Sequence, residues 1–278
     1  MASTTIRVAS VNVNGVRAAF RKGMGAWLDG RGVDILALQE VRASTDDLEQ
    51  LLGPEWNVLH DAATAKGRAG VAIASRGRAH IHRVAIGEED FDTAGRWLEA
   101  DFEIGDAVLT VVSAYVHSGE VGTPKQDDKF RFLDAMEARL PELTAHNPLA
   151  VVVGDLNVAH RRLDIRNWRG NQKASGFLPE ERAYWDRMVG AEDDERYNAG
   201  AGLGWVDVGR RVAGEVDGPY TWWSWRGQAF DNDTGWRIDY QLASPELGQR
   251  VADYRVDKAD SRDGRWSDHT PVVADYAL

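Results

Sequence analysis

Polar residues suited to hydrolytic chemistry follow a short apolar run in the middle of the chain. The segment Ala150–Asn157 reads AVVVGDLN, so Asp155 and Asn157 come directly after residues typical of a strand buried on both faces. A carboxylate in this position could accept a proton from water, and a neighbouring amide could orient that water. Taken alone, the same pattern would equally serve a turn, because Asp and Asn hydrogen-bond their own backbone.

Similar polar residues stand at the ends of other predicted strands. They are Asn12 and Asn14, Glu40, Tyr115, Asp239, and the pair Asp268 and His269. The set is rich in oxygen ligands, and the chain contains neither a cysteine nor a G-x-S-x-G motif. Such ligands suit a hard cation, Mg²⁺ or Mn²⁺, better than zinc. We therefore expect metal-assisted attack of water on a phosphate ester.

The residue types suggest a division of roles within such a site. Glu40 would hold the cation, and Asp155 beside Asn157 would accept the proton of the attacking water. His269 would stabilise the charge that develops on phosphorus, and Asp239 would fix the tautomer of that histidine. Two further donors would line the same pocket: Tyr115 and Asn12.

Alternating helical and extended patterns predict the elements that position these residues. Apolar runs and alternation predict strands at 6–11, 33–40, 56–59, 70–74, 80–84, 97–102, 108–115, 150–154, 237–242 and 272–276. Helical spacing predicts helices at 17–29, 44–52, 130–140 and 179–189, the third closed by Pro141. Polar residues at the carboxyl ends of buried strands are where open α/β sheets usually build their sites.

Composition limits the class of protein. The chain has 278 residues, of which 43% are hydrophobic, and no linker divides it, so we expect a single domain over residues 1–278. Its net charge of −11 opposes binding to a polyanion unless basic residues gather locally. The first 15 residues lack the apolar segment of a signal peptide, and no run of 18 apolar residues could span a bilayer. We expect a soluble, cytoplasmic, monomeric enzyme without a membrane partner.

One loop concentrates positive charge directly downstream of Asp155 and Asn157. Residues 160–173 read HRRLDIRNWRGNQK and contain five Arg or Lys residues against one Asp, a local charge of +4. A basic run on an acidic protein usually forms a solvated face or pairs internally. The position of this loop favours instead a surface that follows phosphates.

Tryptophan is also concentrated in the second half, where eight of the eleven residues lie from Trp168 onward. Clustered tryptophans commonly pack in a core. Within YTWWSWRG, alternation along a strand would send Trp222 and Trp223 to opposite faces. The three residues therefore cannot share one role.

Six short motifs together resemble exodeoxyribonuclease III and the class II apurinic/apyrimidinic endonucleases. In chain order they are NVNG at 12–15, LQE at 38–40, AY at 114–115, GDLN at 154–157, WRID at 236–239 and SDH at 267–269. Each is weak alone, but they cover essentially the whole chain in the family's order. The resemblance implies a DNase I-like α/β fold: a four-layer sandwich of two packed mixed β-sheets flanked by helices.

The same resemblance implies site residues. Glu40 is similar to the principal metal ligand, with Asp268 on the metal side, whereas Asn14 stands where some relatives carry Asp and a second metal position. Two further segments resemble DNA-contacting parts of the repair nucleases, GVRAAFRK at 15–22 and LDIRNWRGNQKASGFLPEER at 163–182. The residues implied to bind DNA are Arg17, Arg21, Lys22, Arg166, Arg169, Lys173, Trp222 and Trp236. Both tryptophans stand where the family lines a pocket for an extruded abasic sugar, although packing remains an equal alternative for Trp222.

The leading functional hypothesis is a Mg²⁺-dependent DNA repair phosphodiesterase, with Mn²⁺ as a substitute metal. It would incise double-stranded DNA 5′ to abasic sites and remove nucleotides or blocking groups from 3′ ends. Two alternatives stay open: a phosphatase or nonspecific DNase of the same superfamily, and a non-catalytic DNA-binding relative. The basic loop disfavours a phosphatase, and the complete set of polar residues disfavours a non-catalytic relative.

Overall fold

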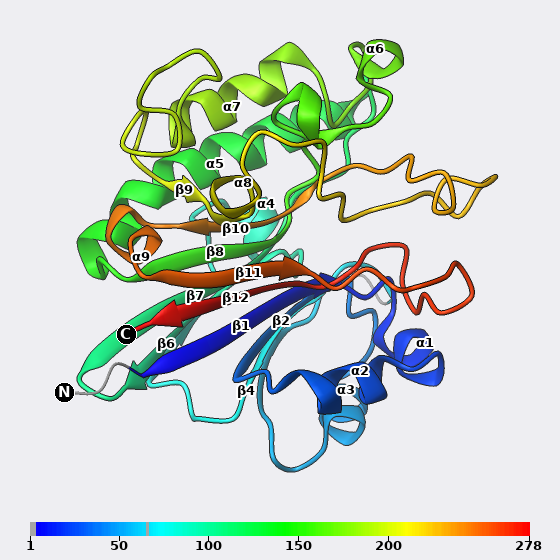
Figure 1. Ribbon diagram of the computed structural model, residues 1–278. Coiled ribbons are helices and arrows are strands. Elements are labelled where there is room, and N and C mark those ends of the chain that lie inside the picture. Colours follow the sequence, from blue (N-terminus) through cyan, green and yellow to red (C-terminus); the bar gives the residue numbers. More distant parts are fainter. Residues whose placement is uncertain (1–3, 65–66) are drawn as a thin grey trace.

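Two six-stranded sheets pack face to face in the computed structural model, which describes residues 4–64 and 67–278 (Figure 1). The first three residues of the amino-terminal segment considered above therefore lie outside the described residues. The first sheet has the strand order β11-β12-β1-β2-β4-β3 and the second β5-β6-β7-β8-β10-β9. Within each sheet one neighbouring pair is parallel, β1 with β2 and β7 with β8, and the other pairs are antiparallel.

The strands fall close to the predicted ranges. Those of the first sheet are β1 (Thr5–Asn12), β2 (Ile35–Gln39), β3 (Asn57–Asp61), β4 (Val71–Ser75), β11 (Val251–Val256) and β12 (Val272–Ala277). Those of the second are β5 (Ile81–Arg83), β6 (Trp97–Ile104), β7 (Ala107–Tyr115), β8 (Ala150–Asp155), β9 (Val206–Asp207) and β10 (Asp239–Ala243). Strands β9 and β11 were not predicted from the sequence.

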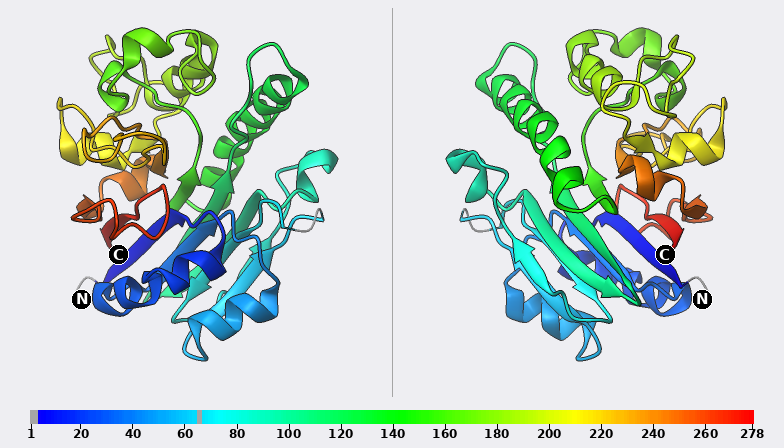
Figure 2. Two further views of the ribbon diagram at one scale, coloured as in Figure 1. Left: turned by 90° about the vertical axis from the view of Figure 1, so that its right-hand side faces the viewer. Right: turned by 90° about the vertical axis from the view of Figure 1, so that its left-hand side faces the viewer.

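Helices cover the outer face of each sheet (Figures 1 and 2). Over the first sheet lie α1 (Val16–Arg21), α2 (Met24–Arg31) and α3 (Thr45–Leu52). Over the second lie α5 (Pro124–His146) and α7 (Pro179–Val189). The shorter helices are α4 (Glu89–Asp92), η1 (Arg162–Asp164), α6 (Trp168–Asn171), α8 (Val208–Ala213) and α9 (Pro245–Gly248). The predicted four-layer arrangement is confirmed.

Alternation along the strands divides the core into three layers. Val8, Ile35 and Val151 point between the sheets and form one buried cluster. Leu36 of β2 points outward and packs under the helices of the first sheet, while Val152 of β8 packs under those of the second. Burial on both faces explains why these strands read as continuous apolar runs.

Two predicted helices differ from the structure. Residues 17–29 form two helices instead of one, because Gly23 adopts a φ of 113° that ends α1 and reorients α2. Pro141 lies inside α5 and does not end it. The helix continues to His146 because Leu143 is buried against the second sheet, and this packing outweighs the hydrogen bond that proline cannot donate.

Candidate active site

Strand register brings the predicted polar residues to one end of the sandwich. Tyr115 of β7 and Asp239 of β10 both stand opposite Asp155 of β8, so three neighbouring strands present them side by side. Gly154 makes this spacing possible, since a Cβ there would lie 1.9 Å from the carbonyl oxygen of Ala114. On the facing sheet β1 ends at Asn12, and Glu40 follows β2.

Asp155 is the centre of the hydrogen-bond network. Its Oδ2 accepts from Asn12 Nδ2 at 2.9 Å and from Asn157 Nδ2 at 3.1 Å, while Oδ1 accepts from the Asn157 backbone N–H at 3.1 Å. Burial raises the pKa of Asp155 to about 7, with Asp239 and Glu40 adding to the effect and His269 and Asn12 opposing it. A carboxylate with a pKa near neutrality is suited to accept a proton at physiological pH.

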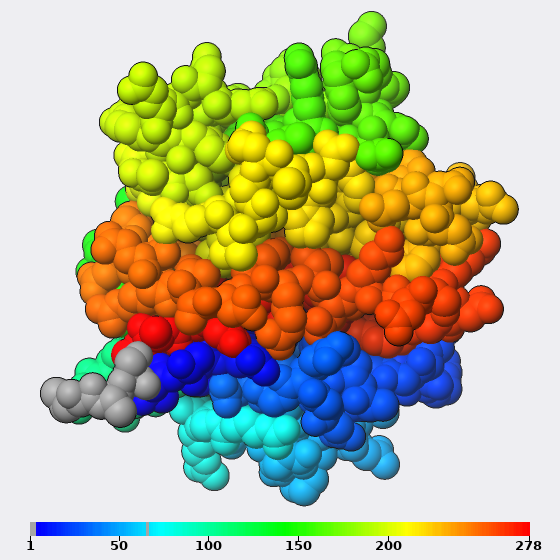
Figure 3. All heavy atoms as spheres, in the orientation of Figure 1, coloured from blue at the N-terminus to red at the C-terminus, as the bar shows by residue number. Residues whose placement is uncertain are grey.

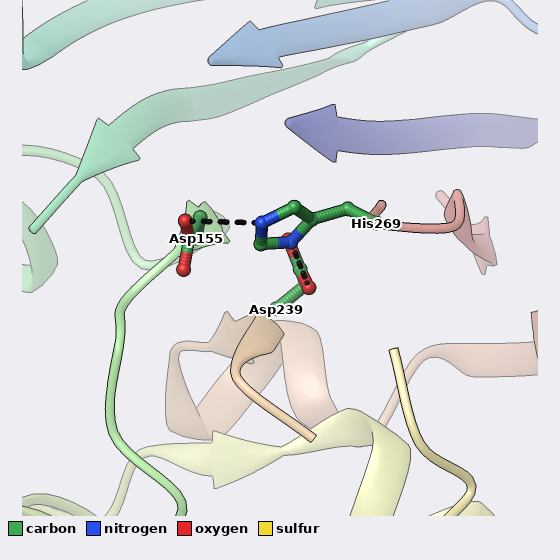
Figure 4. A group of neighbouring side chains, drawn as sticks. All are labelled: Asp155, Asp239 and His269. Carbon is green, nitrogen blue, oxygen red and sulfur yellow. Dashed lines mark hydrogen bonds and ion pairs between the residues drawn. The ribbon is translucent and has the colours of Figure 1, made fainter. Parts of the chain in front are cut away.

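His269 lies between two of the aspartates (Figure 4). Its Nδ1 is 2.9 Å from Asp239 Oδ2, and its Nε2 is 3.7 Å from Asp155 Oδ2. Burial opposes the charged imidazolium, but Asp239 and Asp155 overcome it and raise the pKa of His269 to about 10. The histidine is therefore a cation at neutral pH, held by Asp239 with its second nitrogen directed towards Asp155.

Glu40 and its neighbours form an oxygen-rich wall beside this group. Glu40 Oε1 accepts from Asn12 Nδ2 and from the Tyr115 hydroxyl, both at 2.8 Å. The Arg42 guanidinium forms an ion pair with Glu40 Oε2 and donates to Asn14 Oδ1 at 2.9 Å. Asn14 Nδ2 in turn donates to Asp268 Oδ1 at 2.9 Å.

This wall fits a hard divalent cation. Carboxylate and amide oxygens come from Glu40, Asn14 and Asp268. Two of them, Glu40 Oε2 and Asn14 Oδ1, already contact the positively charged guanidinium of Arg42. Burial opposes ionisation of Asp268, but His269, Asn14 and Trp222 lower its pKa, so the carboxylate is charged. A second set of possible ligand atoms, from Asp155, Asp239 and His269, lies within 4.8 Å of one another. In that set, however, the His269 imidazole is a cation hydrogen-bonded to Asp239, so it is not free to bind a metal ion.

The backbone around the site is held in an uncommon conformation. Seven non-glycine residues in the described part of the chain have positive φ, and four of them, Asn14, Glu40, Arg42 and Asn157, belong to this region. Left-handed φ values cost free energy for such residues and concentrate at functional sites. The packing of the two sheets therefore constrains these four residues.

A pocket of about 550 Å³ opens onto the polar cluster. Its wall includes Glu40, Asp155, Asn157, Asp268 and His269. Trp222 and Trp236 form another part of the wall, with ring centroids 6.2 Å apart in an edge-to-face arrangement. Trp222 also donates from its indole nitrogen to Asp268 Oδ2 at 3.1 Å. Both rings are half-buried, so each combines packing with exposure to the pocket.

Comparisons with known proteins agree with this geometry. The model of the endonuclease/exonuclease/phosphatase family matches residues 9–269. The chain belongs to this family.

Similar members include the exodeoxyribonuclease of Bacillus subtilis, which is 32% identical over 96% of this chain and 98% of its own length. Exodeoxyribonuclease III of Haemophilus influenzae is 27% identical, and the match covers 98% of this chain and the full length of the Haemophilus protein. Among solved structures, an AP endonuclease from Archaeoglobus fulgidus has 26% identity and a TM-score of 0.81, covering 98% of this chain and all of the other. The predicted resemblance and the predicted class, a nuclease that hydrolyses phosphodiesters, are confirmed.

The residues predicted to bind DNA lie on both sides of the pocket in this family member. Arg17 and Arg21 of α1, with Lys22, are exposed on the side of the first sheet. Arg166, Arg169 and Lys173 are exposed around α6 on the other side. Figure 3 shows that segments 222–235 and 257–266, coloured gold and red-orange, both project at the right-hand end of the molecule in that view.

Part of the positive charge in the basic loop is neutralised by acidic residues. Arg161 is buried and pairs with Glu215 and Glu192, at 2.6 and 3.2 Å. Arg166 pairs with Asp217 at 2.9 Å, although both side chains remain exposed. The local charge of +4 in the loop sequence therefore overstates what the surface presents, and Arg162, Arg169 and Lys173 carry most of it.

Several pocket residues were not found from the sequence. Arg42 stands only two residues after Glu40, which was the available signal, but its pairing with Glu40 depends on a positive φ that no pattern reveals. Ser118, Ser175 and Gly176 come from loops. Ser175 and Gly176 lie inside the segment 163–182 that resembles a DNA-contacting part, but neither was singled out. Trp223 is buried against Phe230 on the side away from Trp222, as alternation predicts.

Among the described residues, no helix combines the length and the apolar character needed to cross a bilayer.

Proposed function

We propose that this protein is a Mg²⁺-dependent DNA repair phosphodiesterase acting on double-stranded DNA. It incises the backbone 5′ to abasic sites and removes nucleotides or blocking groups from 3′ ends. The relatives named as exodeoxyribonuclease III and AP endonuclease support this assignment. The single observation that carries it is the joint placement of Asp155, the His269–Asp239 pair and two pocket tryptophans around one cavity.

In this proposal Asp155 accepts the proton of the attacking water. Asn157 donates to both carboxylate oxygens, so it fixes the direction in which Asp155 faces the pocket. His269, charged at neutral pH and held by Asp239, stabilises the negative charge that develops on the oxygens around phosphorus. A positioned base contributes about 10²–10⁴ in rate, and each such donor about 10²–10³.

Glu40, Asp268 and Asn14 would hold the metal. A bound Mg²⁺, or Mn²⁺ in its place, would supply Lewis-acid stabilisation of the phosphate and leaving oxygens. Tyr115 would donate to a phosphate oxygen once this displaces its present contact with Glu40. Asn12, predicted to do the same, is fully buried and does not line the pocket, so it would instead hold the carboxylates of Glu40 and Asp155 through its amide. All these residues come from both sheets of one chain, which supports action as a monomer and as one domain.

DNA binding would use the exposed basic residues on both sides of the pocket: Arg17, Arg21, Lys22, Arg166, Arg169 and Lys173. Trp222 and Trp236 would contact an abasic sugar turned out of the helix, a group small enough to enter where a complete nucleotide is excluded. Because binding would depend on contacts of these residues with phosphates, which release counterions, it should weaken steeply as salt rises, and the net charge of −11 should keep it from being very tight.

The test uses a labelled duplex with one tetrahydrofuran abasic analogue, incubated with Mg²⁺ or with EDTA and resolved on a denaturing gel. A single cut 5′ to the analogue that EDTA abolishes is expected. A 3′ ladder without this cut would reduce the proposal to an exonuclease. No cleavage in Mg²⁺ or Mn²⁺, together with phosphate release from an inositol phosphate, would replace it with the phosphatase alternative.

A further inference from the structure

A buried lysine lies behind the pocket wall and has no part in the mechanism described above. Lys129 of α5 is fully buried, as is the carboxylate of Glu181 on α7, whose Oε1 lies 2.7 Å from Lys129 Nζ. Neither residue lines the pocket. Burying two opposite charges costs desolvation that their attraction only partly returns, so an apolar pair would stabilise the fold at least as well.

The contacts of Lys129 reach three separate segments. Its ammonium donates to the carbonyl oxygen of Asn157 at 2.8 Å and to that of Ser118 at 3.3 Å. It also lies 3.4 Å from Ser175 Oγ. Ser118, Asn157 and Ser175 all line the pocket, although they follow β7, follow β8 and precede α7 respectively.

Glu181 completes the connection on the α7 side. Its Oε2 accepts from the backbone N–H of Gly176 at 2.6 Å and from that of Leu178 at 3.0 Å. Its Oε1 accepts from Ser175 Oγ at 3.1 Å and from Gln126 Nε2 at 2.9 Å. The carboxylate therefore fixes the backbone of the loop that closes the pocket beside Trp236.

Asn157 is the residue whose position depends most on the contacts of Lys129 and Glu181. Its φ of 52° is uncommon for a residue with a side chain, yet its N–H and side-chain amide must both face Asp155. Among the described residues, Lys129 alone donates a hydrogen bond to its carbonyl oxygen. The adjoining wall is tight, since a Cβ on Gly176 would lie 3.2 Å from that oxygen.

We propose that Lys129 and Glu181 form a positioning pair that holds Asn157, and through it Asp155, in the geometry for water activation. The proposal rests on the proposed function. Loss of the pair removes none of the exposed basic residues but lets Asn157 move, and small displacements of reacting groups cost large factors in rate. We expect Lys129→Met to lower kcat about 10- to 100-fold, the range seen when groups that orient reacting residues are removed, with KM changed less than about threefold.

Arg139→Met supplies a matched control on the same helix. Arg139 pairs with the buried carboxylate of Glu99, at 2.9 Å, and its other ion pair is with Glu142. Neither acid lines the pocket. This variant therefore breaks a buried ion pair of α5 without releasing any wall segment, and we expect its kcat to stay within about twofold of the wild-type value.

Three measurements decide the proposal: kcat and KM on the abasic duplex, affinity for that duplex in EDTA, and hydrogen exchange by mass spectrometry. Lys129→Met and Glu181→Gln should lower kcat, preserve affinity, and speed exchange in peptides containing Asn157 and Gly176. Equal losses of kcat in Arg139→Met, or unchanged exchange at Asn157, would overturn it. Wild-type protein that binds but never cuts would overturn the proposed function instead, and the exchange measurement would still decide the positioning claim.

Discussion

Two buried clusters of charge lie within the same fold and behave in opposite ways. The first is the site group of Asp155, Asp239 and His269. The second, here called the arginine network, consists of Asp164, Asp207, Arg210 and Arg237. In the network each acid is matched by a guanidinium: Arg237 lies 2.7 Å from Asp164 and 2.6 Å from Asp207, and Arg210 also pairs with Asp164.

The pKa values of the two clusters show what this difference does. Burial opposes ionisation of Asp164, but Arg237 and Arg210 lower its pKa well below the usual range. Asp155 is equally buried, and burial raises its pKa to about 7 because His269, its one cationic neighbour in the cluster, offsets burial only in part while Asp239 adds to the rise. The matched charges of the arginine network thus hold its segments together. The excess of negative charge in the site group leaves the Asp155 carboxylate able to exchange a proton, and it favours binding of a cation at the pocket wall.

The largest effect should come from separating His269 from its partner. Asp239→Asn removes the charge that keeps His269 protonated and oriented, so we expect incision of abasic DNA to slow by about 10²- to 10³-fold. Single-turnover rates measure this directly. Thermal unfolding should show a folded variant, and a rate within fivefold of wild type would remove Asp239 from the mechanism.

The arginine network should respond in stability instead. Asp207→Asn leaves Arg237 buried with half its partners, and breaking a buried pair in this way costs about 3–5 kcal/mol. Urea unfolding should therefore shift to a much lower midpoint. Because this network has no contact with Asp155, the incision rate per folded molecule should stay within about threefold. A large loss of rate with unchanged stability would contradict the distinction between the clusters.

The two clusters should also change the stability of the fold in opposite directions as the pH falls. A carboxyl with a lowered folded-state pKa contributes stability above its unfolded-state pKa and loses it as pH falls, so Asp164 should make unfolding easier below about pH 4. Asp155 has a raised pKa, so uptake of its proton between about pH 8 and pH 5 should make folding more favourable. Urea midpoints should be measured between about pH 8 and pH 5 in EDTA, for wild type and for Asp155→Asn. We expect the gain in stability with falling pH to disappear in the variant.

The smallest effects concern the surface. Replacing Arg169 and Lys173 together by Ala should reduce the salt dependence of DNA binding by about two counterions, one for each lost phosphate contact. Arg187→Ala, which removes an exposed arginine paired with Glu137 on the helical face, is the control and should leave the salt dependence unchanged. Equal slopes for the two variants would place the DNA elsewhere.

Much of this arrangement could be predicted because the polar residues stand at the beginnings or ends of apolar strands. In a sheet, neighbouring strands bring their ends together, so Tyr115, Asp155 and Asp239 meet although the first and last are 124 positions apart in the sequence. The sequence order of the motifs then identified the family and with it the two-sheet sandwich. Helix boundaries were less accurate, since the left-handed turn at Gly23 and the burial that carries α5 past Pro141 are set by packing.

The supporting contacts could not be predicted. Lys129 and Glu181 lie 52 residues apart on two helices, where each reads as an ordinary charged residue of an amphipathic surface. Their burial depends on how α5 and α7 pack over the second sheet. The same holds for Arg161, which belongs to a basic run in the sequence but is buried against Glu215 in the fold.

The most direct test of the account compares wild type and Asp155→Asn on the tetrahydrofuran duplex in Mg²⁺, with unfolding measured on the same samples. We expect the variant to lose about 10³-fold or more in the rate of incision, in the range of a positioned base. Its stability should be equal or higher, because the variant no longer buries the Asp155 carboxylate, whose ionisation burial opposes. Incision within tenfold of wild type would contradict the role of Asp155 on which the proposed mechanism depends.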